Sequence, residues 1–256
     1  MISHFFNLLF FNPIYNGLIF LIGSCSWIDM GISVILITII VKFLMFPLAK
    51  KSIKLQIKTK IIEPELKTIK EKYKDNKEEQ ARKIMDLYKE NNLNPLSGIF
   101  IMFAQIPIIF ALYFVFLKGG LPDINTDILY SFIKIPMHID MSFLGLIDMT
   151  QKNIFLAILA GISQYIQIRL ILPKIKETHS QKNKQRGFKD DLMKSMHTQM
   201  KFVMPIIVVL ISYNLPSAIA LYWITSNIFM IFQEIFVKRK MEKNDQQTKP
   251  VVVLAK

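Results

Sequence analysis

Lys42 is a charged residue inside a stretch of the chain that is otherwise apolar, Gly31 to Leu48. An ionisable side chain within a membrane-spanning segment is costly, so it marks a candidate functional site. Thr38 lies four residues earlier on the same helical face, and the ammonium group of Lys42 is suited to attract acidic groups. The alternative is a structural role, in which the long stem of Lys42 carries its charge to the membrane surface.

Other uncharged stretches also carry polar or amphipathic side chains. These are Gln105, Gln164, Gln167, Trp223, Ser226 and Asn227. In lipid, polar groups have to face protein or water, because hydrocarbon offers no hydrogen-bond partner. Taken singly, each glutamine is explained by hydrogen bonds between packed helices. Together with Lys42 and Thr38, the set predicts a hydrophilic groove that binds a substrate, with Trp223 in its wall.

The sequence lacks the residue patterns of common enzymes and cofactor-binding proteins. It contains no H-E-x-x-H, no G-x-S-x-G, no P-loop and no glycine-rich dinucleotide turn. A single cysteine, Cys25, excludes an internal disulfide and a cysteine-based zinc site. The four histidines lie outside the predicted spans and do not cluster: His4, His138, His179 and His197. We therefore expect no catalytic residues, no metal and no cofactor, so that partitioning and the membrane potential supply any driving force.

The distribution of charge predicts the class of fold. Of 256 residues, 52% are hydrophobic, yet the net charge is +13 and the charges are gathered between long uncharged stretches. This layout is typical of a polytopic membrane protein. Phe202 to Gln233 contains 32 uncharged residues, about 48 Å as one helix, which is too long for a single crossing. Asn214 to Ser217 (NLPS) predicts a turn between two crossings.

Lysine and arginine residues predict the orientation of the chain. Thirteen lie between Ala49 and Asn94, nine between Arg169 and Lys201, and six from Lys238 onward, out of 32 in all. By the positive-inside rule these three segments lie in the cytoplasm. Segments on the same side are separated by an even number of crossings. The sequence therefore predicts an all-α fold of five transmembrane helices, with the amino end outside and the carboxyl end in the cytoplasm.

The uncharged amino-terminal stretch, Phe5 to Gly23, allows three interpretations: a helix in the outer interface, a sixth span, or a cleaved signal peptide. Asn12-Pro13 has the form of a helix N-cap followed by the first helical position. A helix starting there would have about eleven residues, roughly 17 Å, which is too short to span. No lysine or arginine precedes the stretch, unlike a secretory signal. We favour the interfacial helix.

A charged helical hairpin is predicted between the first two spans. Apolar residues recur at helical spacing from Ile53 to Tyr73, and Asp75-Asn76 then interrupts the pattern and can cap a second helix. The predicted segments are an outer-interface segment at 1–30, spans at 31–48, 95–117, 154–172, 197–214 and 216–237, the cytoplasmic hairpin at 49–94, an external loop at 118–153, a cytoplasmic loop at 173–196, and a basic cytoplasmic tail at 238–256 whose last residues, from Gln246, are expected to be disordered.

Five motifs resemble the YidC/Oxa/Alb membrane protein insertase family, in its short bacterial form. They are DMGISVILITIIVKFLMFPL, EPELKTIKEKYKDNKEEQARKIMDLYKENNLNPLSG, AQIPIIFALY, GISQYIQIRL and MPIIVVLISYNLPSAIALYWITSN. The resemblance implies five helices around a hydrophilic groove that is open to cytosol and lipid, with a cytoplasmic hairpin after the first span. At the position of Lys42, family members usually carry arginine, so the two-pronged contact of a guanidinium with a carboxylate is lost here.

The resemblance also implies a function and a location. The protein is expected to insert nascent membrane proteins into the bacterial cell membrane and to help them fold, without nucleotide hydrolysis. Its implied partners are nascent chains and lipid, with the ribosome and the Sec translocon as further candidates and DNA excluded. Two other functions stay open: a small transporter or channel with an anion site at Lys42, and an assembly chaperone without insertion activity. Transporters commonly show internal repeats and broken helices, and the sequence shows neither.

Overall fold

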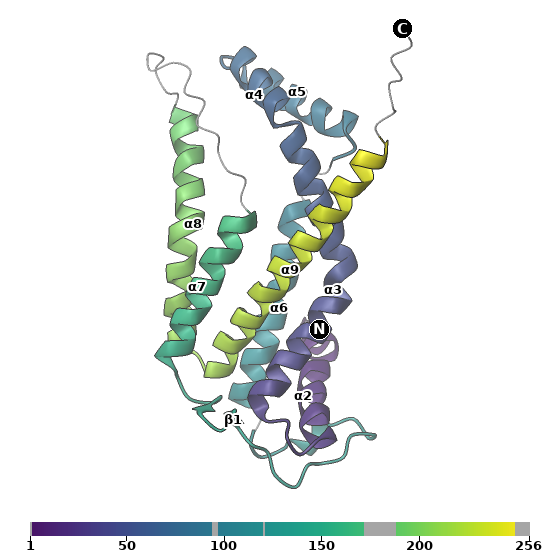
Figure 1. The fold of residues 1–256 in the computed structure, drawn as a ribbon, viewed down its shortest axis with the longest axis vertical. Helices are drawn as coiled ribbons and strands as arrows, with labels where there is room; N and C mark the ends of the chain where they lie inside the picture. Colours follow the sequence, from purple (N-terminus) through teal and green to yellow (C-terminus); the bar gives the residue numbers. More distant parts are fainter. Residues whose placement is uncertain (1, 94–96, 120, 172–187, 249–256) are drawn as a thin grey trace. The chain divides into compact units, whose positions relative to one another are not determined.

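The computed structural model describes residues 2–93, 97–119, 121–171 and 188–248 (Figure 1). Its elements in chain order are α1 (Ile2–Phe6), a π-helical turn (Asn7–Phe11), α2 (Asn12–Ser24), α3 (Met30–Ile61), α4 (Glu63–Lys72), α5 (Lys77–Glu90), α6 (Ser97–Lys118), a 3-10 turn (Thr126–Ile128), β1 (Ser142–Phe143), β2 (Ile147–Asp148), α7 (Ile154–Ile171), α8 (Phe188–Asn214) and α9 (Ser217–Thr248). The chain divides into two compact units. The first unit is Met1–Leu44 with Ile106–Ile231, and the second unit is Met45–Gln105 with Phe232–Lys256.

Several of the described helices are long and apolar enough to cross a membrane. Those that meet both criteria are His4–Ser24, Met30–Thr59 and Ser217–Met241, and shorter apolar helices are Gln105–Leu117, Ile154–Leu170 and Lys201–Asn214. The described part is thus mostly helical, with several helices able to cross a membrane, which agrees with the predicted membrane protein. The number of crossings stays a prediction, and so does the interfacial placement of the first of these helices, whose length would also allow it to span.

The amino-terminal helix begins earlier than the sequence predicts. The chain is helical from Ile2, and the π-helical turn Asn7–Phe11 leads directly into α2. Asn12 is therefore not an N-cap, and the expectation of about eleven helical residues is wrong. Pro13 lacks an N–H and its ring crowds the preceding turn, and the wider π-turn just before it lets the helix continue.

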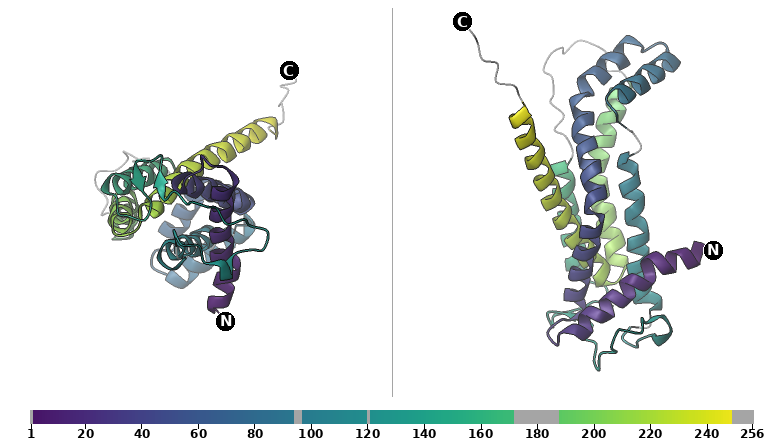
Figure 2. Two further views of the ribbon diagram at one scale, coloured as in Figure 1. Left: turned by 90° about the horizontal axis from the view of Figure 1, so that it is seen from below. Right: turned by 90° about the vertical axis from the view of Figure 1, so that its right-hand side faces the viewer.

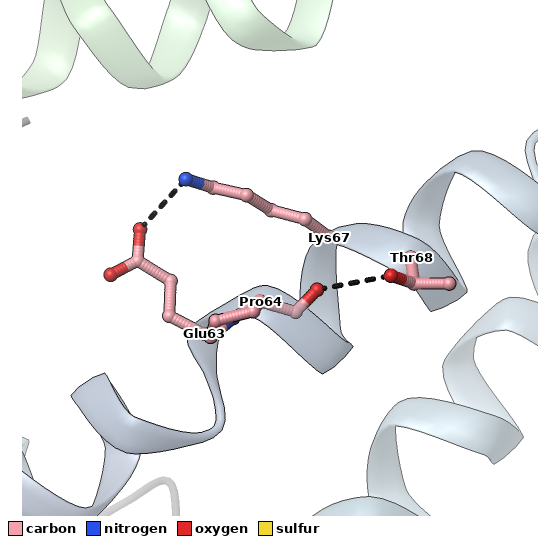
Figure 3. Close-up of polar contacts among 4 residues, drawn as sticks. All are labelled: Glu63, Pro64, Lys67 and Thr68. Atoms are coloured by element: carbon pink, nitrogen blue, oxygen red, sulfur yellow. Dashed lines mark hydrogen bonds and ion pairs between the residues drawn. The ribbon is translucent and has the colours of Figure 1, made fainter. Parts of the chain in front are cut away.

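The first predicted span and the hairpin are joined by one continuous helix. α3 runs past residue 48 to Ile61 with Pro47 inside it, and the helical spacing from Ile53 to Tyr73 is broken at Ile62. The break precedes Pro64, which disfavours a helical residue before it and fits the first turn of a new helix. Figure 3 shows the first turn of α4, where Lys67 pairs with Glu63 at 3.2 Å. In the same turn the Thr68 hydroxyl donates to the Pro64 carbonyl at 3.2 Å.

In the second unit, α4 and α5 pack around a small apolar core. Its buried residues are Ile62, Leu66, Leu87 and Leu93. Asn76 caps α5 as the sequence predicts, because its side chain accepts a hydrogen bond from the Glu79 N–H at 3.1 Å. The buried Gln80 side chain donates to the Lys70 carbonyl at 2.8 Å, which fastens the start of α5 to the end of α4.

The turn between the last two helices is where the sequence predicts it. α8 ends at Asn214 and α9 begins at Ser217, on either side of Leu215-Pro216. The carboxyl-terminal segment differs from the prediction, because α9 continues through Lys238 to Thr248 instead of becoming a tail. Residues 238–248 contain no glycine or proline and many good helix formers, so nothing in the sequence stops the helix. Residues 249–256 lie outside the described part.

Close helix contacts in the first unit depend on glycine. α7 and α8 run antiparallel and side by side (Figure 1). They approach so closely at Gly161 that a side chain there would collide with Val209 of α8. At Gly17 a Cβ atom would lie 2.6 Å from Cδ1 of Ile37, so α2 approaches α3 closely. Figure 2 shows α2 lying at a steep angle to α3. Small residues at such crossings are typical of helices packed in membranes.

The predicted external loop, residues 118–153, contains a small β-hairpin, so the fold is not purely α-helical. β1 and β2 pair antiparallel through Ser142 with Asp148 and Phe143 with Ile147. The connecting turn places Leu144 at φ 54° and Gly145 at φ 69°. Only the glycine adopts this left-handed region readily, so the backbone of Leu144 is held there by other contacts.

The external loop is hydrogen-bonded to the amino ends of α3 and α9 in the first unit. The carboxylate of Asp29 accepts from the N–H of Ile32 at 2.7 Å and from the N–H of Leu144 at 2.6 Å. The hydroxyl of Ser217 donates to the Gln151 carbonyl at 2.6 Å. The loop therefore fixes the ends of both helices.

The same loop is also attached to α2. Nδ2 of Asn16 donates to the Ile128 carbonyl at 2.8 Å, and its Oδ1 accepts from the Tyr130 N–H at 2.6 Å. Asn16 is buried, and both ends of its amide are satisfied in this way. Within the loop, hydrogen bonds from Ser142 lower the pKa of Asp140, which keeps this carboxylate ionised.

Candidate functional site

Lys42 and Thr38 are turned away from the apolar outside of the first unit. Lys42 is 6% exposed and Thr38 1%, whereas the next two residues, Phe43 and Leu44, are 63% and 76% exposed. The Thr38 hydroxyl donates to the Val34 carbonyl at 2.5 Å, one turn back in the same helix. Apolar side chains thus form the exposed face of this part of α3, and the side chain of Lys42 lies on its buried face.

A small cavity beside Thr38 shows which helices meet at this level. Its volume is about 10 Å³, roughly that of one water-sized probe. It is lined from α2, α3, α6 and α9 by Ile14, Ile37, Thr38, Val41, Ile108, Leu112 and Tyr222. Thr38 is therefore close to side chains of three other helices, and most of this lining is apolar.

The polar residues of α9 are buried next to α7. Ser226 and Asn227 are buried and Trp223 is half-buried. Nδ2 of Asn227 donates to Oγ of Ser163 on α7 at 2.9 Å. On the side of α3, the rings of Phe229 and Phe43 meet edge to face with centroids 5.2 Å apart. α9 therefore has contacts with both α3 and α7.

The two glutamines of α7 bond to one another. Nε2 of Gln164 donates to Oε1 of Gln167 at 2.9 Å, and Gln167 is buried while Gln164 is half-buried. A row of exposed apolar residues covers the other side of α7: Phe155, Ile158, Ile162, Ile166 and Leu170. The glutamine pair satisfies part of its own hydrogen-bonding capacity, which agrees with a packing role as well as with a groove.

The first unit contains most of the predicted site residues, on three helices. Those residues are Thr38 and Lys42 on α3, Gln164 and Gln167 on α7, and Trp223, Ser226 and Asn227 on α9. Gln105 is half-buried on α6 and belongs to the second unit.

Ser163 belongs to this polar set although it is not among the predicted site residues. It bonds to Asn227 and donates its own hydroxyl hydrogen to the Ala160 carbonyl at 2.8 Å. Its position four residues before Gln167 places both on one face of α7, and this spacing is the signal that could have identified it.

The chemistry available to this set is hydrogen bonding and attraction of anions. It offers one ammonium group together with amides and hydroxyls, and it lacks a nucleophile paired with a base. Among the residues that the structure describes, no three His, Cys, Asp or Glu side chains gather as metal ligands would. Such an arrangement suits a polar, acidic segment of another polypeptide.

Comparison with known proteins finds relatives over most of the chain. The 60Kd inner membrane protein family matches residues 21–245. A Fusobacterium nucleatum protein named membrane protein insertase YidC is 31% identical over 214 residues, 83% of this chain and 87% of that protein. A Clostridium tetani protein of the same name is 30% identical over 214 residues, 84% of each chain. A longer Francisella philomiragia protein, also so named, is 28% identical over 239 residues, 93% of this chain but 36% of that protein.

Proposed function

The chain belongs to the 60Kd inner membrane protein family, the YidC/Oxa/Alb family that its motifs resemble, and on this premise we propose that it is a membrane protein insertase. It is a multi-pass protein of a cell membrane. In the proposed activity it draws a short hydrophilic segment of a nascent protein partway across the bilayer. The apolar helix of that nascent protein then leaves sideways into lipid.

The observation that carries the proposal is the inward position of Lys42. Ionisable residues within membrane helices almost always face the interior of the bundle or a water-filled cavity, and they mark functional sites. Lys42 is 6% exposed beside two strongly exposed apolar neighbours, Phe43 and Leu44. Snorkelling into bulk solvent would leave the ammonium end exposed, so the burial favours a role inside the bundle.

The other polar residues have supporting roles in this proposal. Lys42 attracts acidic residues of the incoming segment, and Thr38 lies one turn away on the same face of α3. The side chains that would replace water around the segment's backbone are Gln105, Gln164, Gln167, Ser226 and Asn227, and Trp223 would form part of the wall. Shortening the hydrocarbon path in this way lowers the cost of moving polar groups.

The driving force in this proposal comes from the substrate itself. Each buried CH₂ group contributes about 0.8 kcal/mol, so an apolar helix gains enough by entering lipid to proceed without nucleotide hydrolysis. The hairpin of α4 and α5 would receive the substrate on the cytoplasmic side, with the amino end of the chain outside. Contacts of the basic segments with a ribosome or a Sec translocon stay predictions.

Insertion assays with liposomes containing the purified protein test this function. The substrate is a single-span protein with an acidic leading tail. We expect Lys42→Ala to lower the insertion rate about tenfold, equivalent to roughly 1.4 kcal/mol, and Lys42→Arg to retain most activity. Lys134→Ala in the external loop is the matched control and should insert normally.

The assay also separates the competing functions. Equal insertion by wild type, Lys42→Ala and Lys42→Arg would contradict the role of the charge. An anion flux that depends on Lys42, with no insertion by any variant, would instead establish a channel or transporter.

A further inference from the structure

Gln233 and Glu234 form a buried polar pair on α9 within the second unit. They are 6% and 5% exposed, whereas Phe232 and Phe236 on the other side of the helix are 68% and 57% exposed. In the part of the chain that the structure describes, the buried Nε2 of Gln233 has no hydrogen-bond partner. Buried amide donors are nearly always satisfied, so this group is open to an acceptor from another molecule.

Glu234 already holds a cation at this place. One of its oxygens lies 2.6 Å from Nζ of Lys238, and its side chain is 7% exposed against 38% for the lysine. A positive partner offsets the cost of burying this carboxylate. Because Lys238 reaches into solvent, it can give up its place to another cation without being buried itself.

The pair continues the polar side of its own helix. Gln233 follows Ser226 by seven residues, and Glu234 follows Asn227 by the same interval, which is close to two turns. Within the second unit this part of α9 packs beside α3, since the rings of Phe236 and Phe46 have centroids 6.2 Å apart. Gln233 and Glu234 are buried in this part of α9, whereas Phe232 and Phe236 stay largely exposed.

We propose that Gln233 and Glu234 form a second substrate-binding site, which recognises the basic residues flanking the apolar segment of a protein being inserted. Glu234 binds the ammonium or guanidinium group in place of Lys238, and Nε2 of Gln233 donates to a backbone carbonyl of the same flank. This inference rests on the proposed function and adds a specificity for basic flanks that the site around Lys42 does not provide.

The chemistry of membrane proteins gives such a site a purpose. Their cytoplasmic flanks are rich in lysine and arginine, and these cations have to be accommodated where the apolar segment ends. In the orientation proposed above, Glu234 lies toward the cytoplasmic end of the last span. Exchange of one cation for another leaves the carboxylate paired throughout, so binding is reversible and the substrate can be released.

The test compares two substrates in liposomes containing the full-length protein. Both carry the same acidic tail and apolar segment, and they differ only in a short cytoplasmic flank of lysines or of glutamines. We expect Glu234→Gln to lower insertion of the lysine-flanked substrate about fivefold and to leave the glutamine-flanked one unchanged. Gln233→Leu should lower insertion of both, since the backbone carbonyl is common to them.

Control variants test whether the effect belongs to the carboxylate of Glu234. Glu65→Gln, which removes an exposed carboxylate on α4, should change neither substrate. Glu234→Asp should retain the preference for lysine. Equal loss for both substrates with Glu234→Gln, or no loss for either, would overturn the inference. Because the wild-type protein has to insert both substrates, failure of the proposed function would show separately, as insertion of neither.

Discussion

One buried carboxylate, that of Asp29, fixes the geometry of the first unit where α3 begins. Asp29 caps α3 through the N–H of Ile32 and also accepts the N–H of Leu144, which is 115 residues away in sequence. Leu144 adopts φ 54°, a conformation that costs a non-glycine residue roughly 1–2 kcal/mol. The bond from Leu144 to Asp29 offsets part of this cost and fixes the turn of the β-hairpin.

We expect Asp29→Ala to lower the free energy of unfolding by about 2 kcal/mol, because a helix cap and a loop contact are lost together. Thermal unfolding in detergent, followed by circular dichroism, measures the change. Asp127→Ala is the matched control, since Asp127 is exposed in the same loop. Similar melting temperatures for the two variants would contradict the role given to Asp29.

At the level of single residues, helical spacing was informative and long-range pairing was not. The spacing of Thr38 and Lys42 places them on one face of a helix, and the structure finds both buried on that face. Asp29 stands before a helix like many other caps, and nothing near it in sequence indicates Leu144. The bond between Asn227 and Ser163 likewise depends on how α7 and α9 pack, which spacing within one helix does not determine.

At the level of elements, the contact between α7 and α8 depends on the absence of a side chain at Gly161. A Cβ atom there would collide with Val209 and would lie 3.1 Å from the backbone oxygen of Pro205. The side chain of Val209 can rotate, but the carbonyl belongs to the helix itself. The spacing of the two helices is therefore fixed by this glycine.

Gly161→Ala should lower the free energy of unfolding by about 1–3 kcal/mol, because the helices have to move apart. Gly23→Ala is a suitable comparison, since a Cβ atom there would meet the Lys134 carbonyl at an ordinary 3.4 Å. Unfolding of both variants in detergent gives the difference. A larger loss for Gly23→Ala than for Gly161→Ala would exclude this explanation of the helix contact.

Proline explains the main errors in the predicted helix boundaries. Pro13 suggested the start of a helix, but a π-turn carries the helix through it. Pro64 ends α3 at Ile61, although apolar residues keep helical spacing on both sides of the break. Pro216 fell in a real turn. The residue type alone does not decide among these outcomes, because the neighbouring turns determine whether a missing N–H is tolerated.

At the level of the whole molecule, the segregation of charge and apolar residues was sufficient to predict the class of protein. Large apolar side chains are exposed along the described helices, as expected of surfaces that face lipid. The sequence also identified the family through its motifs. The grouping of the chain into two units was not predicted, because it depends on contacts between residues far apart in sequence.

Cys25 provides a direct test of orientation. It is the single cysteine of the chain, and it is exposed between α2 and α3. With the amino end outside, a maleimide that cannot cross membranes should label Cys25 in intact cells. A Cys25→Ser variant that also carries Glu71→Cys on α4 should be labelled only after the cells are permeabilised. The reverse labelling pattern would contradict the predicted orientation of the chain.

The attachment of the external loop to α2, α3 and α9 has a mechanical consequence. Helices that are held at one end move least at that end. Within the first unit, the parts of these helices farthest from the loop are therefore the easiest to displace. A movement that widens the space between these helices would therefore be smallest beside the loop and largest at their opposite ends. The hydrogen bonds of Asn16, Asp29 and Ser217 hold the helix ends beside the loop in place.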